Sequence, residues 1–264
     1  MIVSLSFIPH SPLLIDAIAK ENVQHLKKTH DALSKITSKF EELNVETIIF
    51  LSAHSISHED VFSMNLHDEY TVDLSQFGDH GSHGLFSPDI ELMTQIQRKM
   101  RDLHAPFTLN SQATLDYGTG VPLSVLTSET FRPMIIPISY SGLSAKEHVQ
   151  FGGQLAQVAN SSTRRVAIVA SGDLSHALRS DSPSGFHKHG EVFDMNVQES
   201  FKQGSTSGLL SIDSSVCKHA SECAYLPLLM LFGAKDKLHT TPEILSYEFP
   251  FGVGYLVARF NLEL

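Results

Sequence analysis

The sequence predicts an α/β fold, a single domain with a largely parallel or mixed central sheet flanked by helices. Short, β-branched apolar runs recur along the chain between turn residues, as in strands that are buried on both faces. Longer segments with helical spacing of apolar residues lie between these runs, and this alternation favours a sheet covered by helices. Because no repeat and no Pro/Ser-rich linker interrupts the pattern, we expect one catalytic domain over residues 1–264.

The predicted strands follow in chain order, each short and rich in valine, isoleucine or other apolar residues. They are Ile2–Ile8, Thr47–Leu51, Met134–Ile138, Val166–Ala170 and Gly252–Phe260.

The predicted helices carry apolar residues on one stripe, as Leu26, Leu33, Ile36 and Phe40 do in the first of them. The fourth is closed by Gly204, a residue type that commonly ends helices, and the last is apolar throughout. They are Asn22–Leu43, Pro88–Leu103, Ala145–Asn160, Gly190–Gly204 and Ala224–Phe232. Residues 180–189 are predicted to form a loop, which we expect to lie over the site.

The composition excludes several classes of protein. A net charge of −10 and the lack of a Lys/Arg cluster argue against nucleic-acid binding. The N-terminus "MIVSLSFIPH" has no secretory pattern, and no apolar run approaches the roughly 18 residues that span a bilayer, so neither export nor a membrane partner is expected. Cys217 and Cys223 fit a reduced compartment better than a disulfide framework. We therefore expect a cytoplasmic protein.

Three histidines come shortly after predicted strands: His10 in "FIPHSP", His54 in "FLSAHS" and His176 in "ASGDLSH". Ligands and catalytic groups gather at the carboxyl ends of parallel strands. Each histidine alone could be a hydrogen-bonded loop residue. Since the same position recurs three times, we expect the three imidazoles to converge on one point.

A carboxylate is available to join them. Glu222 precedes the apolar segment Ala224–Phe232, where it can point into the core or act only as a capping acid at a helix N-terminus. Two imidazoles and one carboxylate form the facial triad that binds non-haem Fe(II). A third histidine is then free for acid–base work.

Several short segments, in this order, make the chain resemble a known family. They are "PHSPLLI" at 9–15, "SAHS" at 52–55, "LSQFG" at 74–78, "LDYGTGVPL" at 115–123, "SGDLSH" at 171–176 and "FGVGYLVARF" at 251–260. The chain resembles the class III extradiol ring-cleavage dioxygenases, of the catalytic B-subunit type of protocatechuate 4,5-dioxygenase. Within them it is most similar to the branch associated with AMMECR1 domains and related to the Memo proteins. We expect no AMMECR1 domain within residues 1–264.

The resemblance implies a role for each matching residue. His10, His54 and Glu222 are expected to hold the metal, and His176 is expected to be the catalytic base. Asp173 and Ser175, in the motif that His176 closes, are expected to orient the loop or His176 rather than to bind metal.

Two residues depart from the family pattern or complicate it. Tyr117 stands where dioxygenases of this class commonly have a histidine that contacts substrate or the oxygen intermediate. A phenol can donate a hydrogen bond there but cannot act as an imidazolium. Some Memo relatives use a cysteine near the metal, so Cys223 is either a small buried residue or a thiolate ligand that favours copper or zinc.

The leading hypothesis is a non-haem Fe(II)-dependent extradiol dioxygenase, in which a catechol- or aminophenol-type ring chelates iron through two oxygens and is cleaved with O₂. The alternatives are a Memo-like protein that uses zinc or copper for a redox or hydrolytic reaction, and a scaffold that keeps the fold without chemistry. The expected partners are a small aromatic substrate and O₂, with a homodimer and a small capping subunit or AMMECR1-type partner as further expectations.

Overall fold

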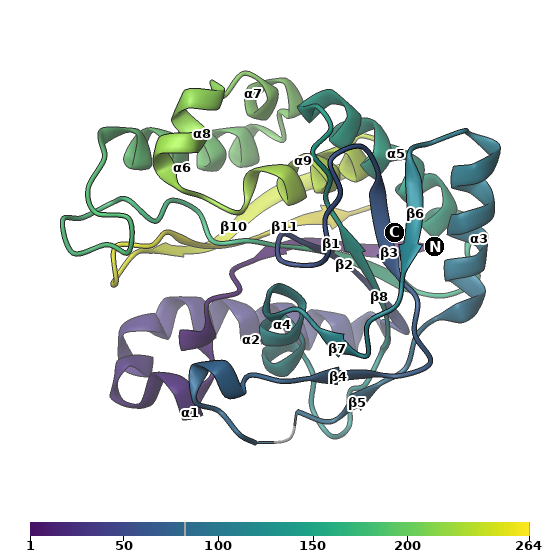
Figure 1. Ribbon diagram of the computed structural model, residues 1–264, viewed down its shortest axis with the longest axis horizontal. Coiled ribbons are helices and arrows are strands. Elements are labelled where there is room, and N and C mark those ends of the chain that lie inside the picture. The colour runs from purple at the N-terminus through teal and green to yellow at the C-terminus, as the bar shows by residue number, and fades with distance from the viewer. Residues whose placement is uncertain (82, 264) are drawn as a thin grey trace.

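Four parallel strands form the centre of the main sheet in the computed structural model, which describes residues 1–81 and 83–263 (Figure 1). They are β1 (Ile2–Ile8), β9 (Val166–Ser171), β2 (Thr47–Ser52) and β8 (Met134–Ser139), paired in that order. Almost every residue in them is buried, because both faces of the sheet are covered. The four predicted strands are thereby confirmed to within one residue at their ends.

One antiparallel neighbour on each side joins this centre to the outer strands, so that the eight-stranded sheet is mixed. On one side β11 (Tyr255–Leu262) pairs with β1, and β10 (Thr240–Glu248) pairs with β11. On the other side β3 (Phe62–Asn65) runs antiparallel to β8, and β6 (Phe107–Asn110) pairs with β3. A separate small sheet has the order β5-β4-β7, made of Leu85–Phe86, Tyr70–Val72 and Thr114–Leu115. The predicted α/β fold is confirmed.

Two helical layers cover the two faces of the sheet, as Figure 1 shows with α5 and α9 on one side and α2 and α4 on the other. Alternation along β2 explains why: Ile49 and Leu51 belong to the core cluster on the α5 and α9 side, and Ile48 and Phe50 to the opposite cluster. The first layer consists of α3 (Ile90–Asp102), α5 (Ala145–Ser161), α6 (Lys188–Gln203), α7 (Thr206–Leu210), α8 (Ser214–Ala220) and α9 (Tyr225–Lys235). The second contains α2 (Lys27–Glu42) and α4 (Tyr117–Leu126), with the short α1 (Asp16–Ala19) beside them.

Three element boundaries can be compared with the sequence prediction, and each has a local reason. The first predicted helix begins as a 3-10 segment over Lys20–Leu26 and becomes α-helical only at Lys27. The last strand begins at Tyr255 because Gly252, with a φ of 70°, belongs to the turn before it. Gly204 ends α6 in the left-handed conformation, as predicted.

No helix within the described residues is long and apolar enough to cross a membrane.

Candidate metal centre

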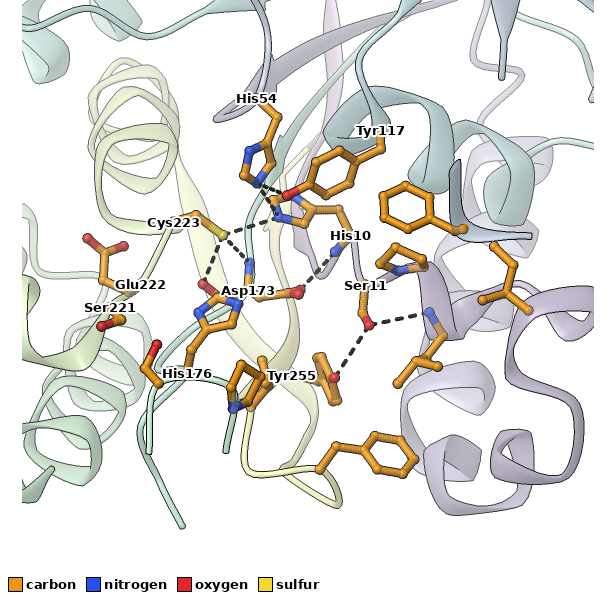
Figure 2. Close-up of a pocket in the computed structure, with 18 of the residues that line it drawn as sticks. His10, Ser11, His54, Tyr117, Asp173, His176, Ser221, Glu222, Cys223 and Tyr255 are labelled. Carbon is orange, nitrogen blue, oxygen red and sulfur yellow. Dashed lines mark hydrogen bonds between the residues drawn. The ribbon is translucent and has the colours of Figure 1, made fainter. Parts of the chain in front are cut away.

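Three adjacent parallel strands bring the predicted site residues to one edge of the sheet. The order β1-β9-β2 places the carboxyl ends of these strands side by side, and His10, Asp173 and His54 each lie two residues beyond a strand end. His176 follows three residues after Asp173. All four line one cavity of about 820 Å³, together with Tyr117, Glu222 and Cys223 (Figure 2). The convergence of the three histidines that their positions predicted is therefore present in the structure.

Three ligand atoms meet at the bottom of this cavity. Nε2 of His10 lies 3.1 Å from Nε2 of His54 and 3.2 Å from Sγ of Cys223 (Figure 2). Metal–nitrogen bonds of about 2.0–2.1 Å and metal–sulfur bonds of about 2.3 Å place tetrahedral ligands roughly 3.3–3.6 Å apart. The spacing of the three atoms thus fits a bound transition metal ion with little rearrangement. Among the described residues, His10, His54 and Cys223 form a group that could hold such an ion.

A hydrogen-bond chain fixes the ring of His10 in the orientation that metal binding needs. Ser171, the last residue of β9, donates its hydroxyl hydrogen to the carbonyl oxygen of Gly118. Its oxygen is then free to accept from Nδ1 of His10, 2.8 Å away. Nδ1 of His10 therefore carries the proton, and the lone pair of Nε2 faces the cavity. Such a partner on the far nitrogen is typical of metal-binding histidines.

Burial keeps both histidines neutral. It lowers the pKa of His10 well below the ordinary value, with the charges of His54 and His176 adding to the effect. Burial also lowers the pKa of His54 to about 4, and His176 again contributes. A neutral imidazole is the form that binds a metal ion, so the two rings are ready to act as ligands near neutral pH.

Cys223 lies in the bend before α9, with its sulfur directed at His10. The amide of Asp173 donates to Sγ over 3.3 Å, which ties the cysteine to the end of β9. Burial raises the pKa of the Cys223 thiol, and the neighbouring Asp173 raises it further. The thiol is therefore protonated until a cation displaces the proton, as is usual for structural and catalytic metal sites.

Glu222 lines the cavity, but its carboxylate is directed away from the two histidines (Figure 2). Its Oε2 accepts the amide hydrogen of Tyr225 at the start of α9 over 2.6 Å. In the structure Glu222 thus serves as the capping acid that the sequence left open, and burial raises the pKa of its carboxyl to about 7. The structure does not bring Glu222 into the group of ligand atoms, and its role as a metal ligand stays a prediction.

His176 faces the cavity from the side opposite Tyr117. Its backbone amide donates to the carbonyl of Ala220, and its Nδ1 is buried. Burial lowers the pKa of His176, although a backbone hydrogen bond to Ser221 opposes the shift, so that the ring is neutral near neutral pH. A neutral imidazole beside a metal site is suited to accept a proton.

Tyr117 begins α4 and lies against His54. The two rings stack with centroids 4.2 Å apart, and the phenol oxygen lies 2.8 Å from Nε2 of His54. Burial raises the pKa of the phenol, and the charges of Cys223, Asp173 and Asp116 raise it further. Tyr117 therefore remains a protonated hydrogen-bond donor.

Asp173 and Ser175 hold the loop that carries His176. Oδ1 of Asp173 accepts the amide hydrogen of His10 over 3.0 Å, linking the ends of β9 and β1. The hydroxyl of Ser175 donates to Ala220, and its amide donates to Oδ1 of Asp194 over 2.8 Å. These three hydrogen bonds hold the loop, and the orienting roles of Asp173 and Ser175 stay predictions.

Two supporting residues, Asp194 and Gly172, lie outside the set of predicted site residues, although Gly172 was expected to shape the turn before His176. Asp194 is buried in α6 and accepts hydrogen bonds from the Ser175 amide and the Tyr247 hydroxyl. The sequence offered no signal for it beyond an acid within an amphipathic helix. At Gly172 a Cβ would lie 2.5 Å from Cα of Ala224, so only glycine lets the end of β9 approach the segment that carries Cys223.

The fold and the ligand group first define a class: an α/β protein with imidazole and thiol donors at the carboxyl ends of parallel strands, suited to a transition metal ion. The chain belongs to the family described as the catalytic LigB subunit of aromatic ring-opening dioxygenase, whose model matches residues 4–258. The resemblance to the extradiol dioxygenase family is thereby confirmed, and the metal dependence of that family agrees with the ligand group. Its closer placement beside Memo-like proteins stays a prediction.

Two similar proteins show how far the similarity extends. Protein CA_C1420 of Clostridium acetobutylicum is 27% identical over 261 residues, which are 96% of this chain and 56% of that protein. The chain thus spans little more than half the length of this relative. The crystal structure of the uncharacterized protein JW3007 from Escherichia coli K12 superposes with a TM-score of 0.70 at 17% identity, covering 97% of this chain and 99% of that one. At this identity the similarity shows the fold alone.

Proposed function

We propose that this chain is a metal-dependent extradiol dioxygenase that opens a catechol- or aminophenol-type ring with O₂ and uses Fe(II). The observation that carries the proposal is the shared cavity, in which the neutral ring of His176 faces the same space as Nε2 of His10 and His54. Membership of an aromatic ring-opening dioxygenase family supports it.

The donor set fits a transition metal ion. His10 and His54 would hold it, with the thiolate of Cys223 as the third donor in the present arrangement. The carboxylate of Glu222 could take that place only by leaving the amide of Tyr225. A bound metal ion would supply positive charge that favours ionised substrate hydroxyls and would bring substrate and O₂ together.

The side chains around the metal position would bind and deprotonate the ring. His176 would accept a hydroxyl proton of the substrate at the ring nitrogen that is open to the cavity. Tyr117 would donate a hydrogen bond from its phenol to the bound substrate. The aromatic side chains of Phe77, Phe251 and Tyr255 line the same cavity and would hold the apolar faces of the ring.

The charge of the cavity narrows the substrate class. Its lining, within the described residues, includes no lysine or arginine. A ring carboxylate would therefore enter without a cationic partner, at the cost of its hydration. We infer that the substrate ring carries hydroxyl or amino groups and no carboxylate.

A second candidate function is favoured by Cys223. Thiolate is a soft donor that selects zinc or copper over an oxygenase iron, and its sulfur lies 3.2 Å from Nε2 of His10. The same cavity would then support a redox or hydrolytic reaction like that expected of Memo-like proteins.

A homodimer, a small capping subunit or AMMECR1-type partner, and a cytoplasmic location remain part of the proposal.

Anaerobic reconstitution separates the two candidate functions. The protein is loaded with Fe(II), Zn²⁺ or copper in turn and mixed with a panel of catechols and aminophenols before O₂ is admitted. The first candidate predicts O₂ consumption with iron alone and a product whose mass is that of substrate plus both atoms of labelled O₂. Failure of the iron-loaded protein to bind or oxidise any member of the panel would overturn it.

A further inference from the structure

A second group of possible metal ligands lies outside the cavity. Within the described residues, His187, His189 and His219 each offer one ring nitrogen, and these atoms all lie within 4.8 Å of one another. None of the three lines the cavity that holds His10 and His54. His187 and His189 lie at the start of α6, whereas His219 lies in the last turn of α8.

Ring contacts hold the three side chains together. The ring of His187 stacks on that of His219 with centroids 4.4 Å apart, and His189 meets both rings edge-on. Nδ1 of His189 lies 3.3 Å from Nδ1 of His219, which keeps the two rings side by side. All three side chains are at least partly exposed, so that small rotations can close the remaining distances.

Backbone contacts orient two of the rings. Nδ1 of His219 lies 2.7 Å from the carbonyl oxygen of Ser215, to which it donates, and this leaves Nε2 with its lone pair outward. Nδ1 of His187 accepts the amide hydrogen of His189 and so caps α6. Binding through that atom would exchange one exposed capping bond for a metal bond.

A carboxylate lies near the three rings. Hydrogen bonds from Ser215 hold the pKa of the Asp213 carboxyl below its ordinary value, and His189 makes a smaller contribution. Asp213 caps α8, the helix that carries His219, and its negative charge beside the imidazoles suits a cation.

We propose that His187, His189 and His219 bind a divalent transition metal ion, Zn²⁺, through imidazole nitrogens, with water in the open position. Three histidines without a thiolate suit zinc, copper or nickel.

The ion would join two segments that frame the cavity. Residues 177–187 link His176 to His187, and the amide of His187 donates to the carbonyl of Ala177. On the other side, α8 ends at Ala220, whose carbonyl accepts from the amide of His176 and which precedes Glu222 and Cys223. Zinc at the surface group would therefore stabilise the segment that carries the proposed base against the segment that carries the proposed thiolate.

Metal titration tests this independently of the activity. We expect the intact protein to bind about two equivalents of Zn²⁺ and the His189→Asn/His219→Asn variant to bind about one, with the remaining ion lost only when His10 is also changed. The matched control His239→Asn replaces an exposed histidine outside the group and should keep both equivalents. In the double variant the affinity of the surface group should fall more than tenfold, since even loss of outer-shell support costs about 10- to 100-fold.

Co²⁺ identifies each site in the otherwise intact protein. Thiolate ligation gives strong near-ultraviolet charge-transfer bands, which imidazole ligation lacks. We expect one Co²⁺ equivalent with those bands, abolished by Cys223→Ser, and one without them, abolished by His189→Asn/His219→Asn. If the double variant binds Zn²⁺ and Co²⁺ as the intact protein does, the surface site is wrong while the buried centre stands. If Cys223→Ser abolishes only the Co²⁺ equivalent with charge-transfer bands and keeps the other, the surface site is supported.

Discussion

The sulfur of Cys223 lies 3.2 Å from Nε2 of His10, although 213 residues separate them in the chain. Two features of the backbone create this contact. Gly172 lets the end of β9 approach Ala224 to a distance that no side chain would allow. The amide of Asp173 then donates to Sγ and holds the thiol in place. The position of the Cys223 sulfur, the third donor of the metal centre, therefore depends on the residues that follow β9 as well as on Cys223 itself.

Substitution of Cys223 tests this arrangement. Because the thiol faces both imidazoles while the carboxylate of Glu222 is bound to the amide of Tyr225, we expect Cys223→Ser to weaken binding of Fe(II) and Zn²⁺ to the buried centre by more than about tenfold. Competition with a chromophoric chelator measures the change.

Glu222→Gln is the matched variant for that experiment. It keeps the size of the side chain and an oxygen that accepts from Tyr225, so it should retain the metal with nearly unchanged affinity. The reverse result, metal lost from Glu222→Gln and kept by Cys223→Ser, would restore the carboxylate as the third ligand.

The framework of the site could be predicted from the sequence because its signals are local. Apolar runs marked the central strands, and the carboxyl ends of parallel strands gather at one edge of a sheet, so the sequence alone placed His10, His54 and His176 together. Local sequence patterns do not show whether Glu222 or Cys223 faces the metal position. The outcome depends on the bend after α8, where Ser221 adopts a φ of 53°, and the periodicity of apolar residues does not predict this bend.

The surface histidines show the same limit. His187 and His189 lie in a segment predicted to be a loop, whereas α6 begins at Lys188. Their partner His219 is 30 residues away from His189, and only the packing of α6 against α8 brings it near. The chain has 15 histidines, and their number does not show which of them combine.

Removal of His176 should affect the reaction and not the metal. The ring lines the cavity and lies outside the group of ligand atoms. We expect His176→Asn to lower kcat by about 10²- to 10⁴-fold, the usual contribution of a positioned acid or base, with metal content unchanged. Single-turnover rates with iron-loaded protein measure it, and loss of metal together with activity would show that His176 is a ligand instead.

The absence of a cationic lining residue within the described chain gives a prediction on specificity. A carboxylate buried without an arginine or lysine loses hydration at a cost of about 1–3 kcal/mol or more, equal to roughly a 10- to 100-fold difference in kcat/KM. We expect catechol to exceed 3,4-dihydroxybenzoate by that factor, measured by O₂ consumption at equal iron loading. A preference for the acid would reveal a cation supplied from outside this cavity.

Asp194 should make stability fall as the pH rises. Burial raises the pKa of its carboxyl to about 7 from an ordinary value of 3.8, although the Tyr247 hydroxyl and the Ser175 amide oppose the shift. Between these two values the folded protein keeps a proton that the unfolded chain releases, so the free energy of unfolding decreases by about 1.4 kcal/mol for each pH unit.

Asparagine at position 194 keeps the shape of the side chain and cannot titrate. We expect the free energy of unfolding of Asp194→Asn to rise relative to that of the natural chain by up to about 4 kcal/mol between pH 4 and pH 8, as measured by urea denaturation across that range. Any constant cost of weakened hydrogen bonds to Ser175 and Tyr247 cancels in this comparison. Asp181→Asn, at an exposed residue paired with Arg179, is the control and should show no such trend. Parallel pH curves for the natural chain and Asp194→Asn would mean that Asp194 is ionised in the folded protein throughout.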